Sequence, residues 1–164
     1  MLSVIFLGAR MQYRLSIYFL CAFSLIGCST TPEKTLTGVE LHKLCYSYSY
    51  GENGYTKSHE EAFKWCTSAA ETNQPSSLTL LAELYTLGNG TDKNLIKAGE
   101  LYEKAAAQGH FHAQLMVYLV YNYYALDEST DKQKELGVEF LKSSKESGYQ
   151  KAIDVYKQVF GQKI

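Results

Sequence analysis

The chain has 164 residues and a formal net charge of −1, and its charges are unevenly distributed. Both arginines, Arg10 and Arg14, precede Cys28, which leaves 14 lysines against 17 acids in the rest of the chain. Nucleic-acid recognition depends on dense positive charge and arginine forks, so this distribution argues against a nucleic-acid-binding protein. With two prolines and 46% apolar residues the chain is not collagen-like, a linker or disordered, and its length suits one compact domain.

Residues 1–27 are predicted to be a signal peptide. Arg14 is followed by an apolar run of 12 residues, from Leu15 to Ile26. This run is too short to cross a bilayer core, which takes about 20 helical residues, so it indicates a secretion signal and not an anchor helix. The segment from Met11 makes a complete signal by itself, which leaves open whether translation starts at Met1 or Met11.

The end of this run, Leu25-Ile26-Gly27-Cys28, resembles the bacterial lipobox, in which the cysteine is acylated and becomes the new N-terminus. This resemblance implies a lipoprotein whose Cys28 carries acyl chains such as palmitate, with residues 28–37 as a lipidated, flexible linker. Ser29 after the cysteine resembles the outer-membrane sorting pattern, so we expect an address in the bacterial cell envelope, facing the periplasm. The alternative is a signal peptide without lipidation, and the membrane leaflet stays open.

From residue 38 to residue 160 the chain repeats itself, and such self-similarity decides the fold before any local pattern does. Four sets of residues recur at intervals of 36 to 39: Tyr48, Tyr85 and Tyr121; Ala62, Ala98 and Gly137; Ala69, Ala105 and Ser144; Asn73, Gly109 and Gly148. Within each unit the apolar residues have helical spacing, as in Leu78, Leu81, Leu84 and Tyr85. Each unit is therefore predicted to be a hairpin of two helices, A and B.

Two segments of the middle unit carry a family resemblance: Leu-Tyr-Thr-Leu-Gly-Asn-Gly at residues 84–90 and Leu-Tyr-Glu-Lys-Ala-Ala-Ala-Gln-Gly-His at residues 101–110. They resemble the Sel1-like repeat, a relative of the tetratricopeptide repeat. The third unit is degenerate, with Tyr124 in place of the loop glycine, and a last helix at residues 150–160 would cap the stack. The resemblance implies an all-α, right-handed α-solenoid of about three hairpins plus a C-terminal capping helix over residues 38–160.

Cys45 and Cys66 occupy positions where the second unit has Ala82 and Tyr102, and both departures fall in one hairpin. Their midpoint lies in the predicted loop, so they are expected at similar heights on facing helices. An oxidising periplasm would then favour a disulfide, while two buried free thiols remain the alternative. A cysteine-rich branch of this family, for which β-lactam binding has been proposed, spaces its cysteines differently, so that property is not carried over.

No catalytic residues are predicted. The sequence lacks the metalloprotease, nucleophile-elbow and phosphate-loop motifs, and Ser129-x-x-Lys132 has no Lys-Thr-Gly partner after it. His110 and His112 are two residues apart and would point to different sides of a helix, which argues against a shared metal ion. We therefore expect a non-enzyme with neither a cofactor nor a metal.

In tetratricopeptide-like stacks the concave wall comes from the A helices, so the resemblance implies a partner-binding groove there. The positions that correspond are His42, Tyr46, Tyr50, Thr79, Glu83, Leu87, Leu115, Leu119, Asn122 and Tyr123. The chain from Cys28 onward holds 12 tyrosines, more than the layers between units need, and tyrosine suits protein interfaces. The alternative is that tyrosine merely replaces Phe and Leu in those layers.

Two hypotheses about function follow. The first is a lipid-anchored periplasmic adaptor that binds a protein or peptide, in one form an immunity protein that inhibits a secreted enzyme, because small Sel1-like lipoproteins resembling this one occur beside type VI phospholipase effectors. The alternative is a cell-wall-active or sugar- or β-lactam-binding accessory enzyme, which would need a pair of carboxylates in the groove. The sequence leaves the partner and the oligomeric state open.

Overall fold

The computed structural model describes residues 35–125 and 127–161, and over these residues the ordered elements are all helical. The predicted signal peptide and Cys28 lie outside the described residues. In chain order the helices are α2 (Gly38–Tyr50), α3 (His59–Ala70), α4 (Pro75–Leu87), α5 (Leu95–Ala107), α6 (Phe111–Leu119), the π-helix η1 (Val120–Tyr124), α7 (Asp131–Glu146) and α8 (Gln150–Phe160).

Local sequence accounts for most of the helix starts. Thr37 and Thr130 each form a capping box, in which the threonine accepts a backbone N–H and a Glu or Gln three residues later reaches back. Ser58 and Asn94 cap α3 and α5 through their side-chain oxygens. Pro75 begins α4, where the missing N–H of proline costs no helical hydrogen bond.

The turns fall where the repeat alignment places them. Between one hairpin and the next, Asn73, Gly109 and Gly148 have φ angles of 56°, 83° and 81°, in the left-handed region that suits Asn and Gly. Within the first two hairpins, Gly51 and Gly88 end the A helix with φ of 73°. The recurrence of these residues therefore reflects a backbone conformation that each unit needs.

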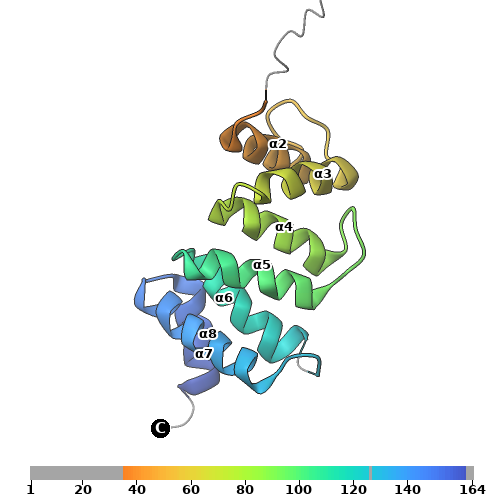
Figure 1. The fold of residues 1–164 in the computed structure, drawn as a ribbon. Helices are drawn as coiled ribbons and strands as arrows, with labels where there is room; N and C mark the ends of the chain where they lie inside the picture. The colour runs from red at the N-terminus through yellow and green to blue at the C-terminus, as the bar shows by residue number, and fades with distance from the viewer. Residues whose placement is uncertain (1–34, 126, 162–164) are drawn as a thin grey trace, which may run out of the picture. The chain divides into compact units, whose positions relative to one another are not determined.

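The A helices α2, α4 and α6 pair with the B helices α3, α5 and α7, and each hairpin packs on the next. Figure 1 shows the hairpins following one another, from α2 and α3 at one end to α7 and α8 at the other. The predicted α-solenoid of three helix hairpins and a final helix is confirmed over the described residues.

Small residues let the helices approach closely inside this stack. Ala62 and Ala98 are fully buried, and Gly137 occupies the equivalent place in the third hairpin. A Cβ atom added to Gly137 would lie 2.7 Å from the Asn122 amide nitrogen and 3.1 Å from the Tyr118 Cα. The third hairpin therefore has no room for the alanine that the first two contain.

The last helix closes the stack. Ala152 is buried and Val155 partly buried against the third hairpin, whereas Lys151, Asp154 and Lys157 are exposed. A polar outer face is what a terminal unit of a repeat protein requires, because no further unit covers it.

Candidate partner-binding surface

Large apolar side chains are exposed on the A helices and not on the B helices. Among the described residues, seven such side chains lie on α2, α4, α6 and η1: Val39, Tyr46, Tyr50, Leu87, Phe111, Tyr123 and Tyr124. None of the exposed large apolar side chains of the described chain lies on α3, α5 or α7. Exposed apolar residues scattered singly over a protein surface are common. Their restriction to one set of helices here indicates a functional surface.

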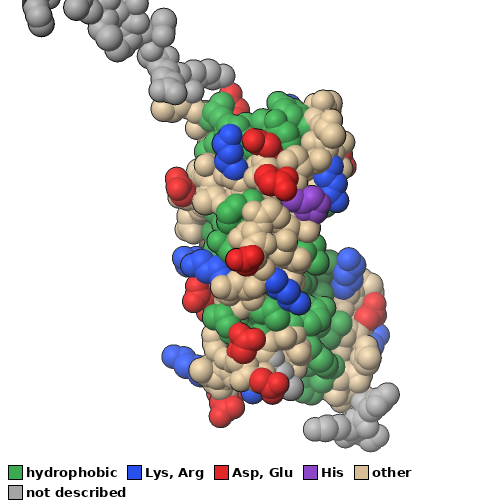
Figure 2. All heavy atoms as spheres, turned by 90° about the vertical axis from the view of Figure 1, so that its right-hand side faces the viewer, with side chains coloured by type: hydrophobic (Ala, Val, Ile, Leu, Met, Phe, Trp, Pro, Cys, Tyr) green, Lys and Arg blue, Asp and Glu red, His purple; other side chains and the backbone are tan. Residues whose placement is uncertain are grey.

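Charge is distributed in the opposite way on the second and third A helices, whereas α2 carries Glu40 and Lys43. Glu83 is the one charged residue on α4, and the described segment from α6 through η1 carries neither Lys, Arg, Asp nor Glu. The B helices carry acids and lysines in near balance, some of them paired, such as Lys64 with Glu61 at 3.5 Å. On the face shown in Figure 2, acidic and lysine side chains are interspersed without a patch of one sign.

A chain of polar contacts crosses the A helices. The Tyr50 hydroxyl on α2 donates to Glu83 Oε2 on α4 at 3.0 Å. Glu83 Oε1 lies 3.4 Å from His112 Nε2 on α6, and His112 Nδ1 lies 3.2 Å from the hydroxyl of Tyr149, the residue before α8. Burial and then the Glu83 carboxylate raise the pKa of Tyr50 to about 12, so its hydroxyl remains a donor at neutral pH.

Two further histidines bridge neighbouring hairpins on the same side. His42 Nδ1 lies 3.0 Å from the Ser77 hydroxyl, and His110 Nδ1 lies 3.2 Å from the Thr79 hydroxyl. Burial lowers the pKa of both histidines, and His112 lowers that of His110 further. The A helices thus meet one another through specific hydrogen bonds as well as through apolar packing.

We define the A-helix wall as the exposed side chains Tyr46, Tyr50, Leu87, Tyr123 and Tyr124 with the partly exposed Glu83 and Leu119. Six of the ten predicted groove residues belong to the A-helix wall: Tyr46, Tyr50, Glu83, Leu87, Leu119 and Tyr123.

The remaining predicted groove residues are buried or partly buried and do not belong to the wall. Thr79 and Leu115 are 4% and 3% exposed, so neither can touch a partner in this structure. The Asn122 amide on η1 donates to the carbonyls of Tyr118 on α6 and Lys134 on α7 and so ties η1 to both helices. His42 is partly buried against Ser77.

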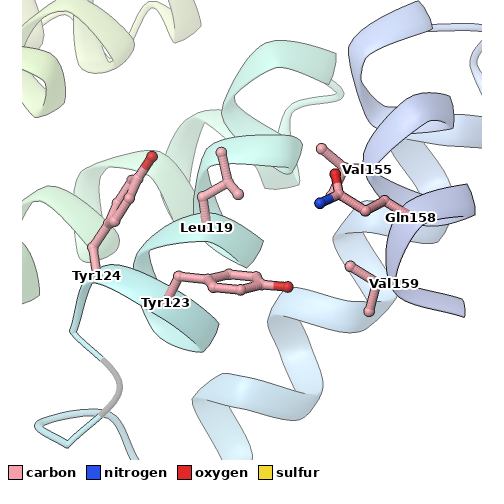
Figure 3. Close-up of a pocket in the computed structure, with 6 residues that line it drawn as sticks. All are labelled: Leu119, Tyr123, Tyr124, Val155, Gln158 and Val159. Carbon is pink, nitrogen blue, oxygen red and sulfur yellow. The ribbon is translucent and has the colours of Figure 1, made fainter.

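A pocket of about 240 Å³ lies at one end of this wall. Its lining residues come from two places in the chain, Leu119, Tyr123 and Tyr124 from α6 and η1, and Val155, Gln158 and Val159 from α8. In Figure 3 the Tyr123 ring lies along one side of the space, Tyr124 stands at its end, and the α8 residues face both. The three α8 residues were not predicted from the sequence, because that helix was expected only to cap the stack.

Cys45 and Cys66 form a disulfide that joins α2 to α3, with their Cα atoms 4.6 Å apart. Both residues are fully buried, as are Ala82 and Tyr102 at the corresponding positions of the second hairpin. This bond supports the first hairpin. The Ser49 hydroxyl lies nearby, 3.9 Å from Cys66 Sγ.

The Ser-x-x-Lys pattern does not bring its two residues together for catalysis. The Ser129 hydroxyl is buried and donates to the Ala125 carbonyl at 2.7 Å, while Lys132 is exposed at the start of α7. Within residues 35–125 and 127–161 we find no cluster of His, Cys, Asp and Glu suited to a metal ion. In the same part of the chain, every helix is too short or too polar to cross a membrane.

Comparison with known proteins gives a consistent result. The family model described as Sel1 repeat matches residues 41–72 and 75–110. The chain is 39% identical over 64 residues to the chitin synthase regulator SKT5 of Saccharomyces cerevisiae, an alignment that covers 38% of this chain and 9% of the yeast protein.

Two crystal structures share the fold. A Sel1 repeat protein from Oxalobacter formigenes has a TM-score of 0.62 at 25% identity, over 93% of this chain and 58% of that one. The protective antigen c5321 of uropathogenic Escherichia coli has a TM-score of 0.64 at 21% identity, over 77% of this chain and 27% of the other. The chain thus spans less than two thirds of the length of each of these three proteins.

Sel1 repeat proteins serve as protein–protein interaction modules and are generally non-catalytic scaffolds. The hairpin geometry, the left-handed residues at each turn and the matches over residues 41–110 agree with one another. Residues 41–72 and 75–110 of this chain are Sel1-like repeats, and the described residues have the fold of Sel1 repeat proteins.

Proposed function

We propose that this protein is a non-catalytic adaptor that binds a partner protein through its A-helix wall. The observation that carries the proposal is the separation of side chains: the exposed large apolar residues lie on the A helices, while most of the charge lies on the B helices. A surface that contacts only solvent would not need its apolar and charged side chains to be separated in this way.

The chemistry of the wall suits protein recognition. Tyr46, Tyr50, Tyr123 and Tyr124 offer large rings with polar tips, and a tyrosine loses little conformational entropy when a partner fixes it. Because Glu83 is the one charged member of the wall, a partner has few ions to desolvate when it covers the surface. Such a surface concentrates binding energy in a few aromatic residues.

We also propose a location for this protein in the cell. The lipobox-like Leu25-Ile26-Gly27-Cys28 supports tethering by acyl chains on Cys28, with residues 28–37 as the linker. The helical unit would then be held at a bacterial membrane, in the outer-membrane case on its periplasmic side, with the wall free to meet a partner.

For the partner we propose a secreted enzyme that the adaptor inhibits, as an immunity protein does. The resemblance to small periplasmic Sel1-like lipoproteins that accompany type VI phospholipase effectors supports this choice. One relative of this chain is named a regulator of chitin synthase, which fits a partner that is itself an enzyme.

The test is affinity purification of the tagged, full-length protein from its own cell envelope, followed by identification of what it retains. Tyr50→Ala and Tyr123→Ala should weaken retention of the partner about 30-fold each, as central interface aromatics do, and leave the helical content and Tm nearly unchanged. Charge reversals on B helices, Glu60→Lys and Lys97→Glu, are the matched surface controls. Partner binding that survives both tyrosine variants but is lost in the B-helix variants would contradict the assignment.

Tyr85→Ala is the complementary control. Tyr85 packs edge-on against Phe63, with ring centroids 5.4 Å apart, and belongs to the layer between hairpins. Its removal should lower the Tm by the several degrees expected for an aromatic core truncation while the folded fraction still binds the partner.

The alternative of an accessory enzyme finds no support in the wall. A pair of carboxylates would be needed, and Glu83 is the one acid on α4, with none on α6 or η1. Its two oxygens already face the Tyr50 hydroxyl and the His112 ring.

A further inference from the structure

The third hairpin departs from the other two where its A helix ends. Gly51 and Gly88 end α2 and α4, and their N–H groups bond the carbonyls four residues back, of Ser47 and Leu84. In the third hairpin Tyr124 replaces the glycine, and the chain makes a π-helical turn, Val120–Tyr124. The Ala125 N–H then bonds the carbonyl five residues back, of Val120, at 2.8 Å.

This turn changes where the side chains at its end point. A π-helical turn inserts an extra residue and rotates those that follow it, and such turns are frequent at functional sites. Tyr123 and Tyr124 are each 54% exposed here, although both are large aromatic residues next to the core. The Tyr118 ring packs edge-on against Tyr123, with centroids 5.7 Å apart, and holds it from one side.

The pocket described above is the space between this turn and α8. Figure 3 shows Tyr123 and Tyr124 on one side of it and Val155, Gln158 and Val159 on the other, with Leu119 between them. The pocket therefore exists where the irregular end of the third A helix meets the capping helix.

The size and chemistry of the pocket limit what it can hold. A cavity of about 150 Å³ in a protein core takes up benzene, so 240 Å³ has room for one aromatic ring or one branched aliphatic group. None of its lining residues is charged, and the Gln158 amide and the two tyrosine hydroxyls supply neutral hydrogen-bonding groups. A charged group placed there would lose hydration without gaining an opposite charge.

We propose that this pocket receives one uncharged, bulky side chain, aromatic or branched aliphatic, of the partner protein, and so anchors that partner to the wall. The inference rests on the proposed function, because it assigns the occupant to a bound protein. The pocket adjoins the exposed part of the wall through Leu119 and Tyr123, so a segment lying on the wall reaches it without a change in the fold.

The first test needs no knowledge of the partner. The probes are N-acetyl-phenylalaninamide, N-acetyl-leucinamide and N-acetyl-lysinamide, each titrated into the isotope-labelled protein while the Leu and Val methyl signals are followed by NMR. The first two should shift the signals of Leu119, Val155 and Val159, and the lysine derivative should not. No shift with either apolar probe, or equal shifts with all three, would overturn the inference.

An acyl chain is the competing occupant. Decanoate is therefore titrated in the same way, and if it shifted these methyl signals at lower concentration than the amino-acid amides, the pocket would belong to a lipid and the inference would fail.

The second test uses a matched pair of variants on α8. Gln158 and Lys157 are adjacent and both exposed, but Gln158 lines the pocket and Lys157 does not. Gln158→Trp should cover the opening, abolish the probe shifts and weaken binding of the purified partner about 30-fold, whereas Lys157→Trp should change neither. Tyr124→Ala removes one of the side chains that line the pocket and should also abolish the probe shifts. This variant replaces Gln158→Trp in the test if the tryptophan variant does not fold.

The two proposals fail in different ways. If Tyr50→Ala weakens partner binding and Gln158→Trp does not, the wall binds the partner but the pocket is not its anchor. If neither substitution matters, the proposed function itself is wrong.

Discussion

Three histidines lie at the contacts between successive hairpins, each with a ring nitrogen near a side chain of the neighbouring repeat. His42 faces Ser77, His110 faces Thr79, and His112 lies between Glu83 and Tyr149. Histidine is the side chain whose charge changes most readily near neutral pH, and burial lowers the pKa of His42 and His110, so we expect acid to weaken these two contacts.

His110 should give the clearest effect, because its Nδ1 also accepts the Ala113 N–H and caps α6. Burial, followed by His112, lowers its pKa in the folded protein, while Glu83 opposes the shift. The unfolded chain therefore takes up this proton first, near pH 6.5, and stability falls as the pH drops below that value. His110→Asn keeps a capping oxygen that does not titrate, so the fall in Tm between pH 7.5 and 5.5 should be smaller than in the wild type.

The measurement is thermal unfolding at a series of pH values, with His59→Asn as a control that removes a histidine outside these contacts. Parallel pH profiles for the wild type and His110→Asn would show that the cap does not titrate in this range.

The disulfide between Cys45 and Cys66 also acts at the scale of single residues. Closing a loop of this length stabilises by about 3 kcal/mol in the chain-entropy model. Cys45→Ala and Cys66→Ala should each lower the Tm, and the double variant should lose little more, because the same bond is lost once. Calorimetry of the three variants tests this, and alkylation of two free thiols in the natively purified protein would contradict it.

At the scale of the helix, packing overrides intrinsic propensity. α5 carries Gly99 in its interior, where alanine would favour the helix by about 1 kcal/mol. A Cβ on Gly99 would meet the ring of Tyr121, with its Cε1 atom 2.5 Å away. Tyr121 is fully buried, and its hydroxyl donates to Glu103 at 2.5 Å, so a shift of the ring would disturb both its packing and this hydrogen bond.

Gly99→Ala is therefore expected to lower the free energy of unfolding by about 1–3 kcal/mol, although helix propensity alone predicts that alanine would raise it. Chemical denaturation gives the value, and Lys97→Ala on the exposed side of the same helix should change it by no more than about 0.5 kcal/mol. Tyr121→Leu removes the opposing ring, so Gly99→Ala should cost less in that background. A Gly99→Ala variant more stable than the wild type would show that the ring can yield.

Packing, and not local sequence alone, also determines how the third A helix ends. The first two A helices end at glycines that the sequence reveals, but Tyr124 gives no stop signal, and the chain instead widens into the π-helical turn. The sequence predicted that this unit is degenerate; the form of the degeneracy, and the pocket it makes with α8, depends on packing between α6, α7 and α8.

At the scale of the whole molecule, the proposed tether decides where the A-helix wall can act. If Cys28 is acylated as proposed, Cys28→Ser should prevent acylation and leave an uncleaved precursor or a soluble product, because a lipobox lipid is attached to the cysteine thiol. Detergent-phase partitioning and mass spectrometry of the wild type and variant test this. A Cys28→Ser protein that still fractionated as mature, membrane-bound material would rule out the lipobox interpretation.

The sequence by itself determined the repeat and its register. Ala, Gly, Asn and Tyr recur at fixed intervals because each unit needs a small residue at a close helix contact, a left-handed residue at a turn and a ring in a layer. These are local requirements repeated along the chain, and the structure confirms them at Ala62, Asn73 and Gly88, among others.

Tertiary structure decided which A-helix residues face outward. The helical period allows several neighbouring positions to face one side, and only the packing of adjacent hairpins buries Thr79 and Leu115 while leaving Tyr50 and Tyr123 exposed. The contacts of Glu83 with Tyr50 and His112, and the pocket between η1 and α8, join residues far apart in the chain. Spacing along one sequence carries no information about such distances, because they are set only when the hairpins stack.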